Sequence, residues 1–153
     1  MPTDRDDLPH VDEHAVEIEG SPGAAWDALI RVVDGSFGST RTAWGARLLG
    51  CADVEAAGPR PLVAGSTFPG FHVEAIEAPR ELALAGRHRF SDYALIFRLD
   101  DLGAGRTRLR AETRAEFPGL KGSAYRAMVI GTRVHMLVTR RLIGAIKLRA
   151  EPA

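Results

Sequence analysis

The sequence predicts a single α+β domain in which a curved antiparallel β-sheet packs against a long C-terminal helix. Segments in the middle of the chain alternate apolar and polar residues, and short turns join them, so consecutive strands pair antiparallel. Residues 118–151, by contrast, place their apolar side chains at helical spacing. A doubly wound parallel sheet is excluded, because no crossover helices separate the later strands.

The chain is expected to begin with an arm and a strand. Residues 1–10 are acidic and carry few apolar groups, so we expect a flexible arm there and one ordered domain over 11–151. From Val11 onward, His14, Val16 and Ile18 alternate with acidic residues. This two-residue period predicts a half-buried strand.

A short helix is expected to follow this strand. Ser21 suits the N-cap position and Pro22 suits the first helical turn. Apolar residues from Trp26 to Val33 then recur at helical spacing. The pattern predicts a helix of about three turns that ends before Gly35.

Five further strands are expected, over 46–52, 67–78, 81–90, 93–100 and 107–117. The last is the clearest, because small or apolar residues alternate with arginine and glutamate along its whole length. Gly103 and Gly105 supply the turn before it, and Ser91 and Asp92 supply the turn before 93–100.

The terminal helix carries polar residues on its packing face. A buried polar group costs roughly 1–3 kcal/mol unless it is hydrogen-bonded, so a purely structural helix rarely buries several of them. We therefore interpret this face as the wall of a ligand cavity. At about 100° per residue, its arc contains Tyr125, Met128, Thr132, His135, Met136, Thr139, Leu142, Ile143 and Ile146.

Composition excludes several classes of function. Twenty basic and twenty acidic residues balance, so the net charge favours neither nucleic acid nor an anionic membrane. The single cysteine, Cys51, excludes an intramolecular disulfide and a thiolate metal cluster. We expect no signal peptide, because residues 1–10 lack an apolar segment, and no run of roughly 18 apolar residues could span a bilayer. We expect a cytoplasmic protein with no nucleic-acid partner, no stable membrane insertion, no metal and no other cofactor.

Three stretches of the chain carry a resemblance to a known family. They are the opening strand with the helix start Ser-Pro-Gly-Ala-Ala-Trp-Asp-Ala-Leu at 21–29, the stretch Ala-Pro-Arg-Glu-Leu-Ala-Leu-Ala-Gly at 78–86, and the terminal helix. On these residues the chain resembles the START-like (SRPBCC) superfamily, in its polyketide cyclase/dehydrase and lipid-transport group, over 11–151. The resemblance implies a helix-grip fold, in which the sheet wraps around the C-terminal helix and leaves an apolar cavity. It does not imply one activity, because members of this superfamily transport lipids, bind hormones or cyclise polyketides.

His135 is the first candidate for chemistry, because it lies about one turn from Thr132 and from Thr139 on the inward arc. It could donate a hydrogen bond to a ligand carbonyl or shuttle a proton. The alternative is a histidine whose ring is hydrogen-bonded by a backbone or threonine oxygen. No second ligand stands at the helical spacing that a zinc site prefers.

His88 is the second candidate, on a strand face shared with Leu82 and Leu84. If that face is inward, His88 points into the cavity, and Arg87 and Arg89 point to solvent. If the face is reversed, an arginine would meet a ligand carboxylate or phenolate. A basic outer face with one edge histidine explains the pattern equally well.

The remaining wall is aromatic and aliphatic. Tyr93 and Tyr125 each begin an element and could offer a hydroxyl either to a ligand or to water. Apolar wall residues, which an ordinary core would explain as well, are Phe71, Leu84, Leu95 and Phe97.

Two functions fit these residues. The first is binding of a hydrophobic or aromatic small molecule, lipid-like or polyketide-like, between the sheet and the C-terminal helix. The alternative is a polyketide cyclase or dehydratase in which His135 or His88 acts as acid or base and a tyrosine or arginine polarises a carbonyl. Convergence of His88, His135 and a tyrosine on one cavity would favour the enzyme.

A homodimer is a further hypothesis. Apolar residues outside the inward arc of the terminal helix would form a patch suited to self-association, unless the sheet curls far enough to cover them. These residues are Ile130, Val134, Leu137 and Leu148.

Overall fold

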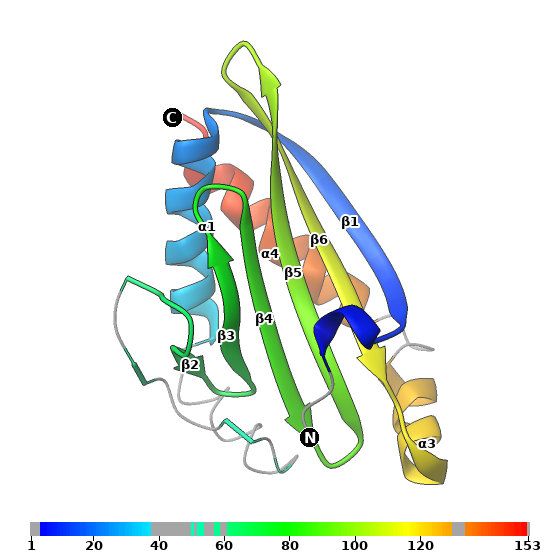
Figure 1. The fold of residues 1–153 in the computed structure, drawn as a ribbon. Coiled ribbons are helices and arrows are strands. Elements are labelled where there is room, and N and C mark those ends of the chain that lie inside the picture. Colours follow the sequence, from blue (N-terminus) through cyan, green and yellow to red (C-terminus); the bar gives the residue numbers. More distant parts are fainter. Residues whose placement is uncertain are drawn as a thin grey trace.

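A six-stranded antiparallel sheet curves around helices on one of its faces (Figure 1). The computed structural model describes residues 4–37, 50, 52–53, 57–58, 61–129 and 134–152. The strand order is β1-β6-β5-β4-β3-β2. The strands are β1 (His10–Glu19), β2 (Thr67–Phe68), β3 (Phe71–Glu77), β4 (Glu81–His88), β5 (Ser91–Gly103) and β6 (Arg106–Glu116).

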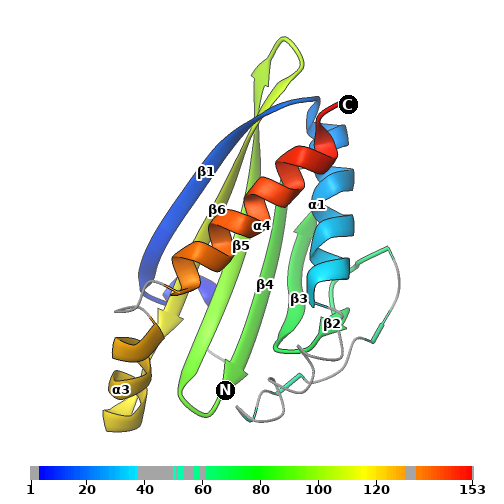
Figure 2. The same cartoon turned by 180° about the vertical axis from the view of Figure 1, so that it is seen from behind.

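Three α-helices are described, α1 (Pro22–Phe37), α3 (Gly119–Val129) and α4 (Val134–Ala150), together with a short 3-10 turn, η1 (Arg5–Asp7). Seen from behind in Figure 2, α4 crosses the concave face of the sheet, and α1 runs beside it. η1 lies on the opposite, outer face (Figure 1). This arrangement is the α+β architecture with a curved sheet that the sequence predicts.

The core fills the space between the sheet and the two helices. Side chains of alternating residues from the central strands meet α1 and α4 there with almost no solvent exposure. Register fixes this face, because Leu82 lies opposite Phe97 and Leu84 lies opposite Leu95 in the β4–β5 pair. The largest fully buried residues of this core, from the sheet and from both helices, are Phe68, Phe97, Ile18, Leu29, Leu82, Leu84, Leu109 and Ile146.

The first helix begins as predicted and ends later. Ser21 Oγ accepts a hydrogen bond from the Ala24 N–H at 3.2 Å, which confirms the N-cap. The predicted end before Gly35 is wrong, because α1 continues to Phe37. Phe37 packs its ring on Phe71 at 5.1 Å, and this contact offsets the cost of about 1 kcal/mol that a glycine imposes inside a helix.

The middle strands differ from the prediction in several places. Ser91 and Asp92, expected to form the turn before 93–100, are instead the first residues of β5, and the turn lies at Arg89 and Phe90. The strand expected over 67–78 is two strands, since Pro69 and Gly70 form a turn in which Gly70 has a φ of 90°. The strand expected over 46–52 falls largely outside the described residues, and Gly50 lies in a turn.

The single long helix expected over 118–151 is two helices. α3 ends at Val129, α4 begins at Val134, and their axes run in different directions (Figure 2). Helical spacing alone could not reveal the change of direction, because both segments carry apolar residues at similar intervals. No helix in the described part of the chain is both long and apolar enough to cross a bilayer.

The C-terminal end of α4 is tied to β1. Lys147 Nζ donates to the backbone carbonyl of Glu17 at 2.6 Å, and the Glu19 N–H donates to Glu151 Oε1 at 3.1 Å. Lys147 and Glu151 also form an ion pair with each other at 2.6 Å. Ile146 is fully buried beside this tie, so the end of α4 is held by both polar and apolar contacts.

The N-terminal segment, expected to be a flexible arm over 1–10, lies against the outer face of the sheet from Asp4 onward. Leu8 is only 4% exposed and packs on Ala83, Ala94 and Ile96. The Ala115 N–H donates to the Pro9 carbonyl at 3.0 Å, and β1 begins at His10. Ala83, Ala94 and Ile96, which face outward from β4 and β5, form an apolar strip on the outer face, and the N-terminal segment covers it.

A charge network surrounds Glu112 on the same outer face. Arg98 Nη1 donates to Glu112 Oε1 at 2.9 Å, and His10 Nδ1 lies 2.7 Å from Oε2. Arg114 Nε lies 3.3 Å from Oε2. Burial raises the pKa of this carboxyl, but the hydrogen bonds from His10, Arg98 and Arg114 outweigh burial and lower its pKa to about 2.

Replacing Glu112→Gln tests this network. Because the folded-state pKa lies below the ordinary value of 4.5, the carboxylate stabilises the fold above pH 4.5, and this stabilisation is lost as the pH falls toward 2. We expect the variant to lose about 2 kcal/mol of unfolding free energy at neutral pH, measured by urea denaturation, and to lose less stability than the wild type on acidification.

The matched control is Glu77→Gln, which removes an exposed ion pair with Arg80. It should change stability by less than about 0.5 kcal/mol at any pH. Equal acid sensitivity of the wild type and the Glu112→Gln variant would contradict the assignment.

Candidate functional site

A connected series of aromatic rings, which we call the aromatic cluster, lies on the concave side of the sheet. Its centre is His88, whose ring centroid lies 4.8 Å from that of Tyr125 and 5.3 Å from that of Tyr93. Tyr93 in turn meets Phe71 edge-on at 5.2 Å. Separate elements therefore bring their rings to one place. The cluster consists of Phe37, Phe68, Phe71, His88, Phe90, Tyr93, Phe117 and Tyr125.

Gly86 allows Tyr93 to lie across β4. A Cβ on Gly86 would come 2.1 Å from the carbonyl oxygen of Gly70 and 2.5 Å from the Tyr93 ring, closer than atoms can approach. The vacant position lets the Tyr93 hydroxyl donate to that Gly70 carbonyl at 2.5 Å. The ring of Tyr93 is thereby fixed beside His88.

The orientation of His88 is defined by its neighbour in the turn. The Phe90 N–H donates to His88 Nδ1 at 3.1 Å, so the neutral ring carries its proton on Nε2. Burial lowers the pKa of His88 below its ordinary value of 6.5, while the nearby charge of Asp92 partly opposes this shift. Near neutral pH, His88 therefore offers an Nε2–H donor.

The structure resolves which face of the 87–89 run is inward. His88 joins the aromatic cluster, on the side of Leu82 and Leu84, as the sequence predicts. Arg87 points to the outer face, where its guanidinium Nε donates to Asp92 at 2.5 Å. An arginine is therefore not presented to the concave side from this position.

The predicted wall residues fall into three groups. Phe71, His88, Tyr93 and Tyr125 come together in the aromatic cluster. Other predicted residues lie in or near the packing of the helices on the sheet: Leu84, Leu95, Phe97 and Thr139 are buried, and Met136 is partly buried. The rest cannot be placed as side chains, because Thr132 and the side chains of Met128 and His135 lie outside the described part of the structure.

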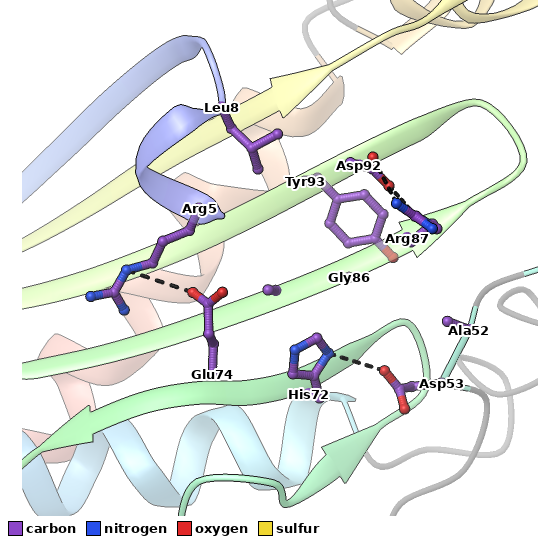
Figure 3. Close-up of a pocket in the computed structure, with 11 residues that line it drawn as sticks. Arg5, Leu8, Ala52, Asp53, His72, Glu74, Gly86, Arg87, Asp92 and Tyr93 are labelled. Carbon is purple, nitrogen blue, oxygen red and sulfur yellow. Dashed lines mark hydrogen bonds and ion pairs between the residues drawn. The ribbon is translucent and has the colours of Figure 1, made fainter. Parts of the chain in front are cut away.

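A hollow of about 170 Å³ lies on the opposite, outer face, between η1 and strands β3 to β5 (Figure 3). The carboxylate of Asp53 accepts a hydrogen bond from His72 Nδ1 at 3.1 Å. Arg5 Nε lies 3.6 Å from Glu74 Oε2. Figure 3 shows these two pairs on either side of the Gly86 backbone, which also lines the hollow.

This outer groove was missed by sequence reasoning. The strand alternation over 71–77 does place His72 on the other face of the strand from Phe71 and Val73. The groove, however, is also lined by Arg5 and Leu8, which belong to the segment expected to be flexible. Each carboxylate lining the groove faces a cationic group or a histidine, so the groove can hold water or a small polar molecule without a strong charge preference. In the described residues, no three His, Cys, Asp or Glu side chains gather in a way that could hold a metal ion.

Comparison with known proteins identifies the fold. No protein-family model and no curated protein matches the chain. Among solved structures, CalU16 from Micromonospora echinospora matches with a TM-score of 0.56 and 13% identity, over 95% of this chain and 84% of that one. A point mutant of norcoclaurine synthase from Thalictrum flavum, in complex with a transition-state analogue, matches with a TM-score of 0.59 and 11% identity, over 94% and 97%.

A third match is protein CV1439 from Chromobacterium violaceum, with a TM-score of 0.53 and 10% identity, over 94% of this chain and 100% of that one. Similarity at this level of identity concerns the fold alone. The chain shares the fold of these proteins, and this fold is the helix-grip fold that the resemblance in its sequence implies.

The environment of His88 predicts a pH effect. Because its folded-state pKa is lowered, the neutral ring stabilises the fold above pH 6.5, and this stabilisation is lost as the pH falls through the folded-state value. Wild-type protein should therefore lose more stability between about pH 7 and pH 5 than the His88→Asn variant. Nitrogen chemical shifts should show the proton on Nε2. A pKa above 6.5, or a proton on Nδ1, would contradict the geometry.

Proposed function

We propose that this domain binds a hydrophobic or aromatic small molecule, of lipid-like or polyketide-like character, on the concave side of its sheet. The observation that carries the proposal is the convergence of His88, Tyr93 and Tyr125 in one aromatic cluster. These residues come from β4, β5 and α3, and each was a candidate from the sequence alone. Their convergence supports a common contact surface for a ligand.

The chemistry of the cluster fits a planar ligand with one polar group. Aromatic faces and edges favour stacked or edge-on contact with a flat apolar body. The Nε2–H of His88 can donate to a carbonyl or phenol oxygen, and no described residue accepts a hydrogen bond from it. One directional donor among apolar rings is the arrangement by which such sites orient a ligand.

The packing of the core supports this place for the ligand over the opposite end of the concave face. Between the sheet and the helices α1 and α4, the side chains of Phe97, Leu109 and Ile146 belong to one core cluster, and each has no solvent exposure. Tyr125 and His88 are only partly buried. A ligand would therefore displace fewer closely packed side chains at the aromatic cluster than beneath the helices.

Displacement of a polarity-sensitive dye tests the proposal. Anilinonaphthalene sulfonate should bind the wild-type protein and be displaced by oleic acid or by a hydroxyanthraquinone. Tyr125→Leu and His88→Asn should each weaken binding of the effective competitor by about tenfold, since each removes a ring contact or a hydrogen bond.

The matched control is His72→Asn, which changes a histidine on the neighbouring strand but on the outer face. Its affinity should equal that of the wild type. If neither the dye nor either competitor binds, and native mass spectrometry detects no bound small molecule, the proposal fails.

A cyclase or dehydratase remains the second candidate, favoured by the contact of His88 with two tyrosines. Because the Nδ1 lone pair is already engaged by Phe90, His88 would polarise a carbonyl as a donor rather than act as the base. A linear poly-β-ketone thioester provides the assay. His88→Asn should lower its turnover by about 10²–10⁴-fold while changing its affinity by no more than about tenfold. Unchanged substrate with the wild-type protein would eliminate the enzyme and leave the binding function.

A further inference from the structure

The basic residues of this chain are segregated in a way that its neutral net charge conceals. The sequence from 119 to 150 contains seven lysines and arginines and no aspartate or glutamate. The rest of the chain contains the other thirteen basic residues and all twenty acidic residues, so it carries a net negative charge. The helices α3 and α4 therefore form a positive part of a molecule whose other part is negative.

The two parts also differ in how their charges are used. Arginines of the sheet are neutralised by neighbouring carboxylates, as Arg98 is by Glu112 and Arg110 is by Asp100. On α4, by contrast, Arg140, Arg141 and Arg149 are exposed, and none forms an ion pair or hydrogen bond with another residue of the described structure. Their charges are available to a partner.

Apolar side chains project from the same surface of α4. Leu137 is 52% exposed and Leu148 is 79% exposed. They are eleven positions apart, which brings them within about 20° of each other around the helix axis. Arg140 and Arg141 fall on either side of this line, and the buried Leu142 and Ile146 fall on the opposite side. We call this surface the α4 outer face.

We propose that the α4 outer face docks on a membrane surface that contains anionic phospholipid. Guanidinium groups would contact lipid phosphates, while Leu137 and Leu148 would enter the boundary between headgroups and acyl chains. This is peripheral contact by one side of a helix that remains packed on the sheet through its other side. It requires no membrane-spanning segment, and it does not depend on the proposed ligand.

The combination of charge and leucine favours lipid over other polyanions. Nucleic acid would use the arginines, but it gains little from aliphatic side chains and is usually stacked on aromatic ones. A second copy of this chain would bring Arg140 and Arg141 of both copies together across a twofold axis, which is repulsive. A lipid surface accommodates both kinds of side chain in one contact.

Vesicle flotation with the full chain tests the inference. The wild type should bind vesicles of phosphatidylcholine mixed with phosphatidylserine, should not bind vesicles of phosphatidylcholine alone, and should dissociate as salt increases. The double variant Arg140→Gln/Arg141→Gln should bind about 30-fold more weakly, since each basic residue near an anionic surface contributes about a factor of five. Leu137→Ser/Leu148→Ser should bind about tenfold more weakly.

The matched control is Arg87→Gln/Arg108→Gln, which removes the same charge from exposed positions on the outer face of the sheet. It should retain wild-type binding, and circular dichroism should show that all variants are folded. Equal losses in the control and the α4 variants would overturn the inference, as would failure of the wild type to bind. Full retention by the leucine variant would assign the surface to polyanions in general. A dimer in light scattering that Leu137→Ser/Leu148→Ser abolishes, without vesicle binding, would assign it to self-association.

Discussion

Phe97, Leu82 and Leu109 lie beneath α1 and α4 with no solvent exposure, and this apolar contact is the one on which the rest of the structure depends. Side chains alternate along a strand, so the contact also determines which residues face outward. A shift of one residue in any central strand would bring its arginines and glutamates under the helices, where they could not be solvated. The same strand alternation that places the apolar residues in the core thus places the paired charges around Glu112 on the outer face.

The aromatic cluster occupies the part of the concave face where this aliphatic packing gives way to rings. Its composition follows from a backbone feature, because Tyr93 can cross β4 only where Gly86 has no side chain. Tyr93 and His88 are then close enough for ring contact, and the Phe90 N–H determines which nitrogen of His88 is protonated. The arrangement of rings and donors in this cluster is set by a glycine and a turn amide as much as by the aromatic side chains themselves.

Local patterns predicted the parts of the molecule in which local and tertiary preferences agree. Strand alternation predicted most of β1, β4, β5 and β6. It also placed His88 on one face with Leu82 and Leu84, but it left open whether that face is inward. It could not predict that α1 would continue past Gly35, because the reason is a tertiary contact of Phe37. The outer groove could not be predicted either, since Leu8 has no periodic pattern around it and packs on residues of β3, β4 and β5 that are far from it in the sequence.

Because the C-terminal end of α4 is hydrogen-bonded to β1, any tilt of this helix would displace its N-terminal end the most. Lys147 and Glu151 fix one end, while Leu137 and Val138, near the other, are largely exposed. The distance along the axis from Lys147 to the start of α4 is about 20 Å, so a tilt of about 10° would displace the start by about 3.5 Å. That is roughly the thickness of an aromatic ring. The same tilt would displace the buried Leu142, five residues from Lys147, by only about 1.3 Å, so the displacement is concentrated at the start of the helix.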